Sequence, residues 1–241
     1  KDDRIFRIFE RFFKYQTSGW ICNSSSARDT LLNYCGIPEN KITFIYNGIE
    51  PQKLNLNKNL KQDIILTLAN FAPRKGIIEY LDVIERVIKK NKNVKFIIAG
   101  RDDMNGLVQK EIKKKELEKY VETPGFVKTT PDLIKISKFM VMPSILPEGC
   151  PTSIIEGMAS GKPAIGYNIE GLKELIKNNK TGYIIKKYDK NNMADCILKL
   201  LNDNELIEKF GYNAYNEIRK NFSLSKMLKK HREVFEYFNE F

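Results

Sequence analysis

PEGCPTSIIEGMASGKP, residues 147–163, joins a turn-rich loop to an apolar helical run. A β-branched strand pattern ends near Ser144, and either Pro151 or Thr152 suits the first position of a helix. Gly161, followed two residues later by another proline, marks the end of that helix. The helix therefore starts at the carboxyl end of a predicted parallel strand, which is where open α/β sheets bind ligands.

Strand and helix patterns alternate in the same way over most of the chain. We expect strands at residues 64–68, 94–99, 121–126, 139–143, 164–167 and 183–185. The expected helices between and after them cover residues 77–90, 106–119, 131–137, 152–158, 172–177, 191–201, 205–221 and 224–238. The predicted fold class is therefore α/β: a doubly wound, mainly parallel, Rossmann-like sheet with C-terminal helices.

The first 50 residues form a separate piece in the sequence. A basic helical pattern carries the apolar residues Ile5, Phe6, Phe9, Phe12 and Phe13. A strand at 20–22, a helix at 25–35 and a strand-like run at 42–46 follow it. One strand–helix pair cannot bury its own faces, so we expect the end of a truncated Rossmann-like N-terminal domain. The aromatic helix fits either a cap on the missing sheet or an interfacial membrane anchor.

A turn-rich hinge at residues 47–51 divides the chain. We expect residues 1–50 to end the truncated domain, residues 51–222 to form a second Rossmann-like domain, and residues 223–241 to form a C-terminal helix. The chain has no initial Met and starts within a helical pattern, so it is interpreted as a fragment of a longer protein. It has no signal-peptide pattern and no apolar run of about 18 residues, which predicts a cytoplasmic protein.

The composition argues against several classes of function. The net charge of +11 favours anionic partners, but no nucleic-acid-binding signature accompanies it. The four cysteines are far apart without a Cys-x-x-Cys pair, which disfavours a zinc site. His231 is the single histidine, so Ser-His-Asp or Cys-His catalysis is not expected. The sequence also lacks an Asp-x-Asp pair that would hold a cation on a diphosphate, which favours chemistry without a metal.

The start of the helix predicted at 152–158 suits an anion. Its free backbone N–H groups and the helix dipole favour a phosphate or diphosphate, and Gly149 lets a ligand approach the backbone closely. Glu148 and Glu156 bracket this site, and each can accept hydrogen bonds from hydroxyl groups of sugars attached to the diphosphate. The segment Ser153-Ile154-Ile155-Glu156 is also a capping-box pattern, in which Glu156 only satisfies the helix start.

A basic pair precedes the helix predicted at 77–90. Lys75 lies close to the start of that helix, where the dipole disfavours a cation, so a nearby anion would explain its position. For Arg74, a solvent-exposed role explains the residue equally well.

Several motifs in order resemble the GT-B glycosyltransferases, specifically the C-terminal donor-binding domain of the retaining family 4 (glycosyl transferases group 1). Glu148 and Glu156, separated by seven residues before a Gly/Ala-rich helix end, are similar to the hallmark of that family. The other motifs that resemble it are Trp20-Ile21-Cys22-Asn23-Ser24, KITFIYNGI (41–49), Ala72-Pro73-Arg74-Lys75-Gly76, Gly125-Phe126-Val127, GLKELI (171–176) and Thr181-Gly182-Tyr183. The resemblance covers most of the chain.

The resemblance implies a role for each matching residue. Lys75, with Arg74, would neutralise the diphosphate of a nucleotide-sugar donor. Glu156 would bind the ribose hydroxyls, and Glu148 would contact the transferred sugar as the catalytic residue. A phosphate cradle would be completed by the segment Gly149, Cys150, Pro151, Thr152 and Ser153.

Other positions depart from the family pattern or are less specific. Phe126 is expected in the core, so that contacts to the base would use backbone groups around Val127. Asn70 stands where many members carry a diphosphate-binding arginine, so its task could shift to Arg74. Glu170 replaces the first glycine of a common Gly-Gly pair.

The implied function is transfer of a sugar from a UDP- or GDP-sugar to an acceptor hydroxyl, with retention and without cofactor or metal. The acceptor, a glycan or glycolipid, would be held by the missing N-terminal domain, so the isolated chain is expected to be inactive. Surface polysaccharide or glycolipid synthesis and peripheral contact with the inner face of an anionic membrane would suit the basic surface. Two alternatives stay open: a noncatalytic nucleotide-sugar-binding module, and a GT-B sugar-nucleotide 2-epimerase, which the shortage of histidine disfavours.

Overall fold

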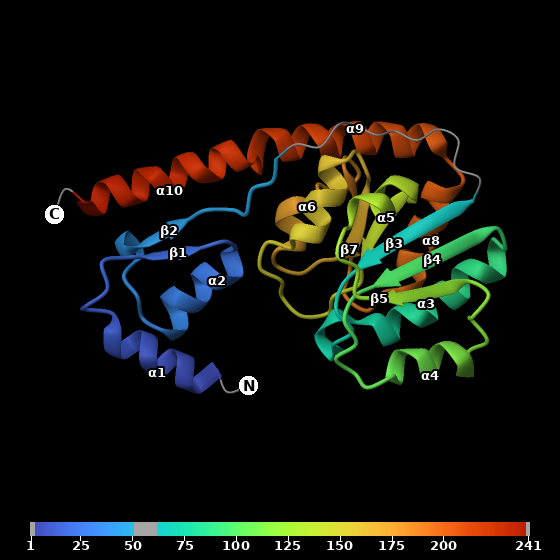
Figure 1. Cartoon of the computed structure of the whole chain (residues 1–241), viewed down its shortest axis with the longest axis horizontal. Helices are drawn as coiled ribbons and strands as arrows, with labels where there is room; N and C mark the ends of the chain where they lie inside the picture. The colour runs from blue at the N-terminus through green and yellow to red at the C-terminus, as the bar shows by residue number, and fades with distance from the viewer. Residues whose placement is uncertain (1–2, 51–61, 240–241) are drawn as a thin grey trace.

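A computed structural model describes residues 3–50 and 62–239 of the chain (Figure 1). Its strands form two separate parallel sheets. The smaller sheet pairs β1 (Trp20–Cys22) with β2 (Ile42–Phe44). The larger sheet has six strands in the order β5-β4-β3-β6-β7-β8. The structure confirms the predicted doubly wound, Rossmann-like class.

The strands of the larger sheet are β3 (Asp63–Leu68), β4 (Val94–Ala99), β5 (Val121–Gly125), β6 (Phe139–Met142), β7 (Ala164–Tyr167) and β8 (Gly182–Ile185). The helices that connect and follow them are α3 (Ile77–Lys90), α4 (Leu107–Lys114), α5 (Pro131–Ile136), α6 (Thr152–Ala159), α7 (Leu172–Leu175), α8 (Lys190–Leu201), α9 (Asn204–Asn221) and α10 (Leu224–Asn239). The N-terminal helices are α1 (Asp3–Phe13) and α2 (Ser25–Asp29), and α2 continues into a π-helical turn (Thr30–Tyr34).

Two of the helices that flank the larger sheet, α4 and α7, end two or more residues earlier than the sequence pattern predicts. α4 stops at Lys114 rather than at residue 119, because Glu116 adopts a left-handed backbone conformation with φ of 55°. Leu117 then turns into the core and has no exposed surface. α7 is a single turn that ends at Leu175, because the next residue is extended and buried.

The order in which strands are added to the larger sheet reverses between β3 and β6. The chain runs from β3 outward to β4 and β5, returns to the other side of β3 as β6, and continues outward to β7 and β8. Leu66 of β3 and Met140 of β6 are partners in the parallel register. The loops that leave the carboxyl ends of β3 and β6 therefore start side by side, at the position where doubly wound sheets bind ligands.

Helices cover both faces of the larger sheet. α3, α4 and α8 lie on one face, and α6 and α9 lie on the other (Figure 1). Every residue of β6 and β7 is buried, as expected for strands covered on both faces. The N-terminal segment has a small core of its own, formed by Cys22, Leu31, Cys35 and Ile37.

The N-terminal segment joins the rest of the molecule near the end of α9 and the start of α10. The Ile49 amide donates to the Phe222 carbonyl, and the Leu224 amide donates to the Ile49 carbonyl, both at 2.9 Å. α10 then extends across the two-stranded sheet (Figure 1). The predicted hinge ends at Pro51, which lies outside the described residues, and the division into three domains stays a prediction.

The predicted aromatic helix at the N-terminus is α1. Phe12 and Ile8 are 71% and 66% exposed, and they belong to a row of exposed apolar side chains on this helix. The side chain of Phe6 lies outside the described residues. Among the described helices, none combines the length and apolar character that a membrane-spanning helix needs.

Lys162 is a buried cation between α6 and β7. The residue is only 3% exposed, and this burial lowers the pKa of its ammonium group from 10.5 to about 8. The unfolded chain therefore keeps this proton to a higher pH than the folded chain does. Through this group, the free energy of unfolding rises with pH between about 8 and 10.5.

We expect Lys162→Met to raise the free energy of unfolding at pH 7 by about 1–3 kcal/mol, because it removes a desolvated charge. The gain should shrink between pH 8 and 10.5, where the folded and then the unfolded wild-type chain lose the proton. Urea unfolding at pH 7 and pH 10 measures both effects, and Lys110→Met, at an exposed lysine, is the control. An equal gain at both pH values would contradict the expectation.

Candidate functional site

Two loops meet at the carboxyl edge of the larger sheet. The β3–α3 loop (residues 69–76) contains a 3-10 turn, Pro73–Lys75, and the β6–α6 loop covers residues 143–151. The Ile145 amide donates to the Arg74 carbonyl at 3.0 Å. At Gly76, an added Cβ atom would lie 2.2 Å from the carbonyl oxygen of Pro143. The two loops are therefore in direct backbone contact.

Glu148 binds both basic residues of the β3–α3 loop. Lys75 Nζ donates to Glu148 Oε1 at 2.7 Å, and Arg74 Nη1 donates to Glu148 Oε2 at 3.3 Å. The side chains of Glu148 and Lys75 are 7% and 12% exposed, whereas that of Arg74 is 52% exposed. The structure brings together three residues that the sequence assigned to one site. Two cations against one carboxylate leave positive charge at this edge, which favours an anionic ligand.

The loop after β7 supports Glu148 from the other side. The Glu148 amide donates to the Glu170 carbonyl at 3.1 Å. Gly171 has a left-handed backbone with φ of 84°, and an added Cβ atom there would lie 2.2 Å from the Gly149 carbonyl oxygen. Only glycine allows this close approach. The position of Glu148 is thus fixed by backbone contacts as well as by its ion pairs.

The start of α6 has no side-chain cap. Its N-cap is Pro151, whose carbonyl accepts from the amides of Ile154 and Ile155 at 3.1 and 3.2 Å. The first N–H groups of the helix thus have no capping side chain and are oriented for an anion. Thr152, at the first helical position, is exposed, and Ser153 is half-buried.

Glu156 does not cap the helix. The capping-box interpretation is wrong, because α6 starts at Thr152 and Glu156 lies about one turn inside it. Its carboxylate instead accepts a hydrogen bond from Thr130 Oγ1 at 2.7 Å. Thr130 is the N-cap residue of α5, and its sequence context gave no sign of this contact. Glu156 is half-buried, so its carboxylate has room for a further hydrogen-bond donor.

The remaining expected residues are placed differently. Asn70 is exposed, and its side-chain oxygen accepts from the Arg101 amide at 3.2 Å. Its side chain therefore binds the neighbouring loop after β4. Phe126 is 71% exposed, so the expectation that it lies in the core is wrong. It follows Gly125, whose positive φ of 76° turns the chain out of the edge strand β5. Val127 is half-buried against the core.

Cys150 is a buried thiol in the β6–α6 loop. Burial raises the pKa of this thiol to about 12, so it stays protonated at neutral pH and is a poor nucleophile. Its carbonyl accepts from Asn47 Nδ2 at 2.9 Å. Gly149, next to it, is exposed, and its α-carbon faces the Asn23 side chain. The loop is therefore in contact with the N-terminal segment.

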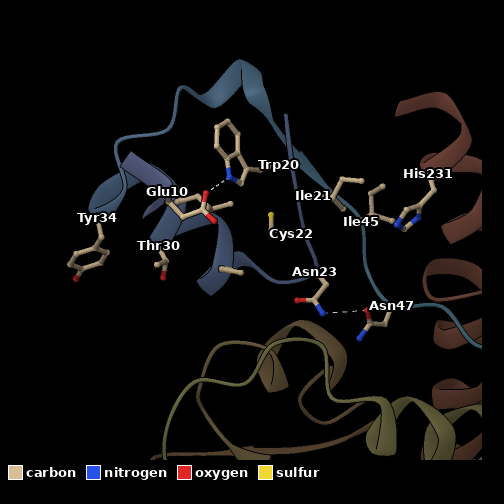
Figure 2. A pocket seen from close by; sticks show the side chains of 12 residues that line it. Glu10, Trp20, Ile21, Cys22, Asn23, Thr30, Tyr34, Ile45, Asn47 and His231 are labelled. Atoms are coloured by element: carbon tan, nitrogen blue, oxygen red, sulfur yellow. Dashed lines mark hydrogen bonds between the residues drawn. The ribbon is translucent and has the colours of Figure 1, made fainter. Parts of the chain in front are cut away.

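A large pocket of about 970 Å³ surrounds β1 in the N-terminal segment (Figure 2). On one side of β1, Trp20 donates a hydrogen bond to Glu10, whereas Ile45 and His231 lie on the other side of this strand. The lining residues thus lie on both faces of β1. Among the described strands, β1 is paired only with β2. A free strand edge of this kind is what the sequence predicts for the end of a larger sheet.

No cluster of three or more His, Cys, Asp or Glu side chains within residues 3–50 and 62–239 is placed to share a metal ion. The metal independence expected from the sequence stays a prediction.

The parallel sheet, the reversal of its strand order between β3 and β6 and the charged residues at the ends of these two strands define a Rossmann-like domain with a candidate anion-binding site. The sequence profile described as glycosyl transferases group 1 matches residues 49–217, and that described as glycosyltransferase family 4 matches residues 1–53. The chain belongs to the glycosyl transferases group 1 family.

Characterised relatives are longer than this chain. The chain is 31% identical over 219 residues to the poly(ribitol-phosphate) α-N-acetylglucosaminyltransferase of Staphylococcus aureus, covering 81% of this chain and 44% of that protein. It is 27% identical to the α-D-kanosaminyltransferase of Streptomyces kanamyceticus, covering 92% of this chain and 61% of that protein. A variant of S. aureus TarM, solved with Fondaparinux, α-GlcNAc-glycerol and UDP, matches with a TM-score of 0.84 at 29% identity, over 93% of this chain and 45% of that chain.

We expect Gly76→Ala to destabilise the fold more than Gly106→Ala. Both glycines precede a helix with positive φ, 64° and 78°, but a Cβ atom at Gly106 would meet nothing within 4 Å. The left-handed backbone costs alanine roughly 1–2 kcal/mol at either position. The clash with Pro143 should add about 1–3 kcal/mol at Gly76. Urea unfolding measures the difference, and equal losses in both variants would show that the two loops are not in tight contact.

We expect the Lys75–Glu148 pair to be coupled by roughly 1–3 kcal/mol in a double-mutant cycle with alanine, because both groups are largely desolvated. The matched surface pair is Lys90 with Asp195, 3.3 Å apart and 67% and 65% exposed. That pair should give at most about 1 kcal/mol. Urea unfolding of the single and double variants provides the two coupling energies. A coupling energy for Lys75 and Glu148 no larger than that for the surface pair would contradict the expectation.

Proposed function

We propose that this chain carries the donor site of a retaining glycosyltransferase, which transfers a hexosyl group from a UDP-sugar to an acceptor hydroxyl without a metal ion. The observation that carries the proposal is the position of Lys75, Arg74 and Glu148 beside the uncapped start of α6. Family membership and the UDP complex of TarM support a nucleotide-sugar donor.

Lys75, Arg74 and the first amides of α6 would bind the diphosphate. As the bond between the anomeric carbon and the diphosphate oxygen breaks, negative charge develops on the leaving UDP. Fixed cations and helix N–H groups stabilise that charge more strongly in the transition state than in the ground state. Side chains that supply this positive charge would make a bound metal ion unnecessary.

Glu156 would bind the ribose of the donor. Its carboxylate already accepts from Thr130, and a carboxylate offers further lone pairs to a sugar hydroxyl. Thr130 would therefore orient the carboxylate and leave it able to accept a further hydrogen bond. Backbone groups around Val127 and the exposed Phe126, on the neighbouring β5 loop, would lie on the side of the base.

Glu148 would contact the transferred sugar, and it also restrains Lys75. A diphosphate that binds Lys75 has to share the ammonium group with Glu148 or replace it as its partner. Removing the negative charge of Glu148 should therefore free Lys75 for the nucleotide while it impairs catalysis. This opposite effect on binding and catalysis distinguishes Glu148 from Lys75 and Glu156.

The complete activity is proposed for the whole protein, because the chain spans only 44% and 61% of the two curated relatives. The acceptor, a glycan or glycolipid, would bind the N-terminal domain, and the transferase relatives favour this activity over a noncatalytic module or a 2-epimerase. Contact with an anionic membrane stays a prediction. The exposed face of α1 would suit such a surface, but it would equally suit packing against a further part of the N-terminal domain.

We expect UDP to raise the melting temperature of the chain more than GDP, ADP or dTDP does, with the same shift in EDTA and in magnesium. Ligand at a hundred times its dissociation constant adds about 2.7 kcal/mol to the free energy of unfolding, enough for a thermal-shift assay. Lys75→Ala and Glu156→Ala should each weaken UDP binding at least about tenfold, the loss of one charged contact. Glu148→Gln should retain or strengthen it.

Lys110→Ala, at an exposed lysine on α4, is the charge control and should leave UDP binding unchanged. Isothermal titration calorimetry gives the dissociation constants of all four variants. If UDP does not bind, or if Lys75→Ala binds it as the wild type does, the proposed site is wrong. A shift that requires magnesium would exclude the metal-free mechanism.

A further inference from the structure

Glu174 links the loop after β7 to the N-terminal segment. Its carboxylate accepts from Ser25 Oγ at 2.5 Å and from the Ser25 amide at 3.3 and 3.4 Å. It also accepts from the Gly171 amide at 3.2 Å. One side chain thus bonds two segments that are 149 residues apart in the sequence.

A carboxylate suits this position because two helices begin there. Ser25 is the first residue of α2, and Gly171 is the N-cap of α7. The first N–H groups of a helix have no partner within the helix and favour a negative charge. Glu174 provides the oxygen atoms for both, so loss of its charge would weaken both attachments at once.

Asn47 makes a second contact across the same boundary. Its Nδ2 donates to the Cys150 carbonyl at 2.9 Å, and its Oδ1 accepts from Asn23 Nδ2 at 3.3 Å. Figure 2 shows the two asparagines side by side at the end of β1. Asn23 Oδ1 lies 3.2 Å from where a Cβ atom at Gly149 would stand. The N-terminal segment therefore touches the β6–α6 loop directly.

The two contacts meet at the residue that carries the proposed chemistry. Gly171, which bonds to Glu174, packs against the carbonyl groups of Glu148 and Gly149, with added Cβ distances of 2.5 and 2.2 Å. Asn47 fixes the next carbonyl along the loop. A movement of the N-terminal segment would thus shift the backbone that directly follows the Glu148 side chain.

We propose that Glu174 and Asn47 are positioning residues, which hold the β6–α6 loop in its ligand-binding geometry when the N-terminal segment is docked. The proposal rests on the proposed function for its consequence, because the loop carries Glu148 and precedes the phosphate-binding start of α6. Neither residue is assigned a contact with the donor in the proposed site. They act through the loop backbone and couple the position of the N-terminal segment to donor binding.

Amide hydrogen exchange of the full chain without nucleotide tests the coupling itself. Glu174→Ala should speed exchange at least about fivefold at residues 25–29, and by a similar factor at residues 148–150. Ser25→Ala is the milder variant, which removes one bond and keeps the carboxylate, and it should show the same pattern more weakly. Glu170→Gln is the matched control, since its half-buried carboxylate pairs with Lys173 of α7 rather than with Ser25 of the N-terminal segment. Faster exchange confined to residues 25–29 would overturn the proposal.

Titration with UDP tests the consequence for the site. Glu174→Ala and Asn47→Ala should weaken UDP binding about three- to tenfold, and Glu174→Gln, which keeps one acceptor oxygen, should recover part of the loss. By reciprocity, UDP should slow exchange at residues 25–29 in the wild type but not in Glu174→Ala. Unchanged UDP affinity in both alanine variants would overturn the positioning role. If the wild type does not bind UDP, the proposed function fails, while the nucleotide-free exchange still decides whether the two segments are coupled.

Discussion

The ion pair of Lys75 and Glu148 is the contact on which the site depends, and the parallel sheet makes it possible. The two residues are 73 positions apart in the sequence. They meet because β3 and β6 are neighbouring strands, at the point where the strand order reverses. The loops that follow these two strands therefore leave the same edge of the sheet. Gly76 then lets the β3–α3 loop approach Pro143, which brings Lys75 within reach of the Glu148 carboxylate.

Most of the fold could be predicted because its signals are local. Apart from the edge strand β5, the strands of the larger sheet are short, mainly apolar runs between turn residues, and the long helix α3 has the expected bounds. The helix ends were harder to predict where a single backbone angle decides them, as at Glu116, whose positive φ ends α4 early. The exposed Phe126 was misplaced for a related reason: β5 is an edge strand, and Gly125 turns the chain outward there.

The site was predictable as a set of residue types but not as a network. Lys75, Arg74 and Glu148 were each assigned to a ligand, and the sequence could not show that they also bind one another. The capping-box pattern at Ser153 failed because the helix already starts at Thr152, with Pro151 as its N-cap. The four-residue pattern begins after both of these residues and therefore could not show the earlier start. The partners of Glu156 and Glu174, Thr130 and Ser25, come from distant segments and left no signal at their own positions.

The two cations of the β3–α3 loop differ in exposure, and this gives them different tasks. Lys75 is 12% exposed, so its ammonium group needs an anion beside it to offset the loss of water. Glu148 supplies that anion within the protein, and a diphosphate would supply it in a complex, so Lys75 faces the sheet edge in both cases. Arg74, which is 52% exposed, can change direction at little cost. In the proposed site, Lys75 would therefore determine where the anionic ligand lies, and Arg74 would adjust to it.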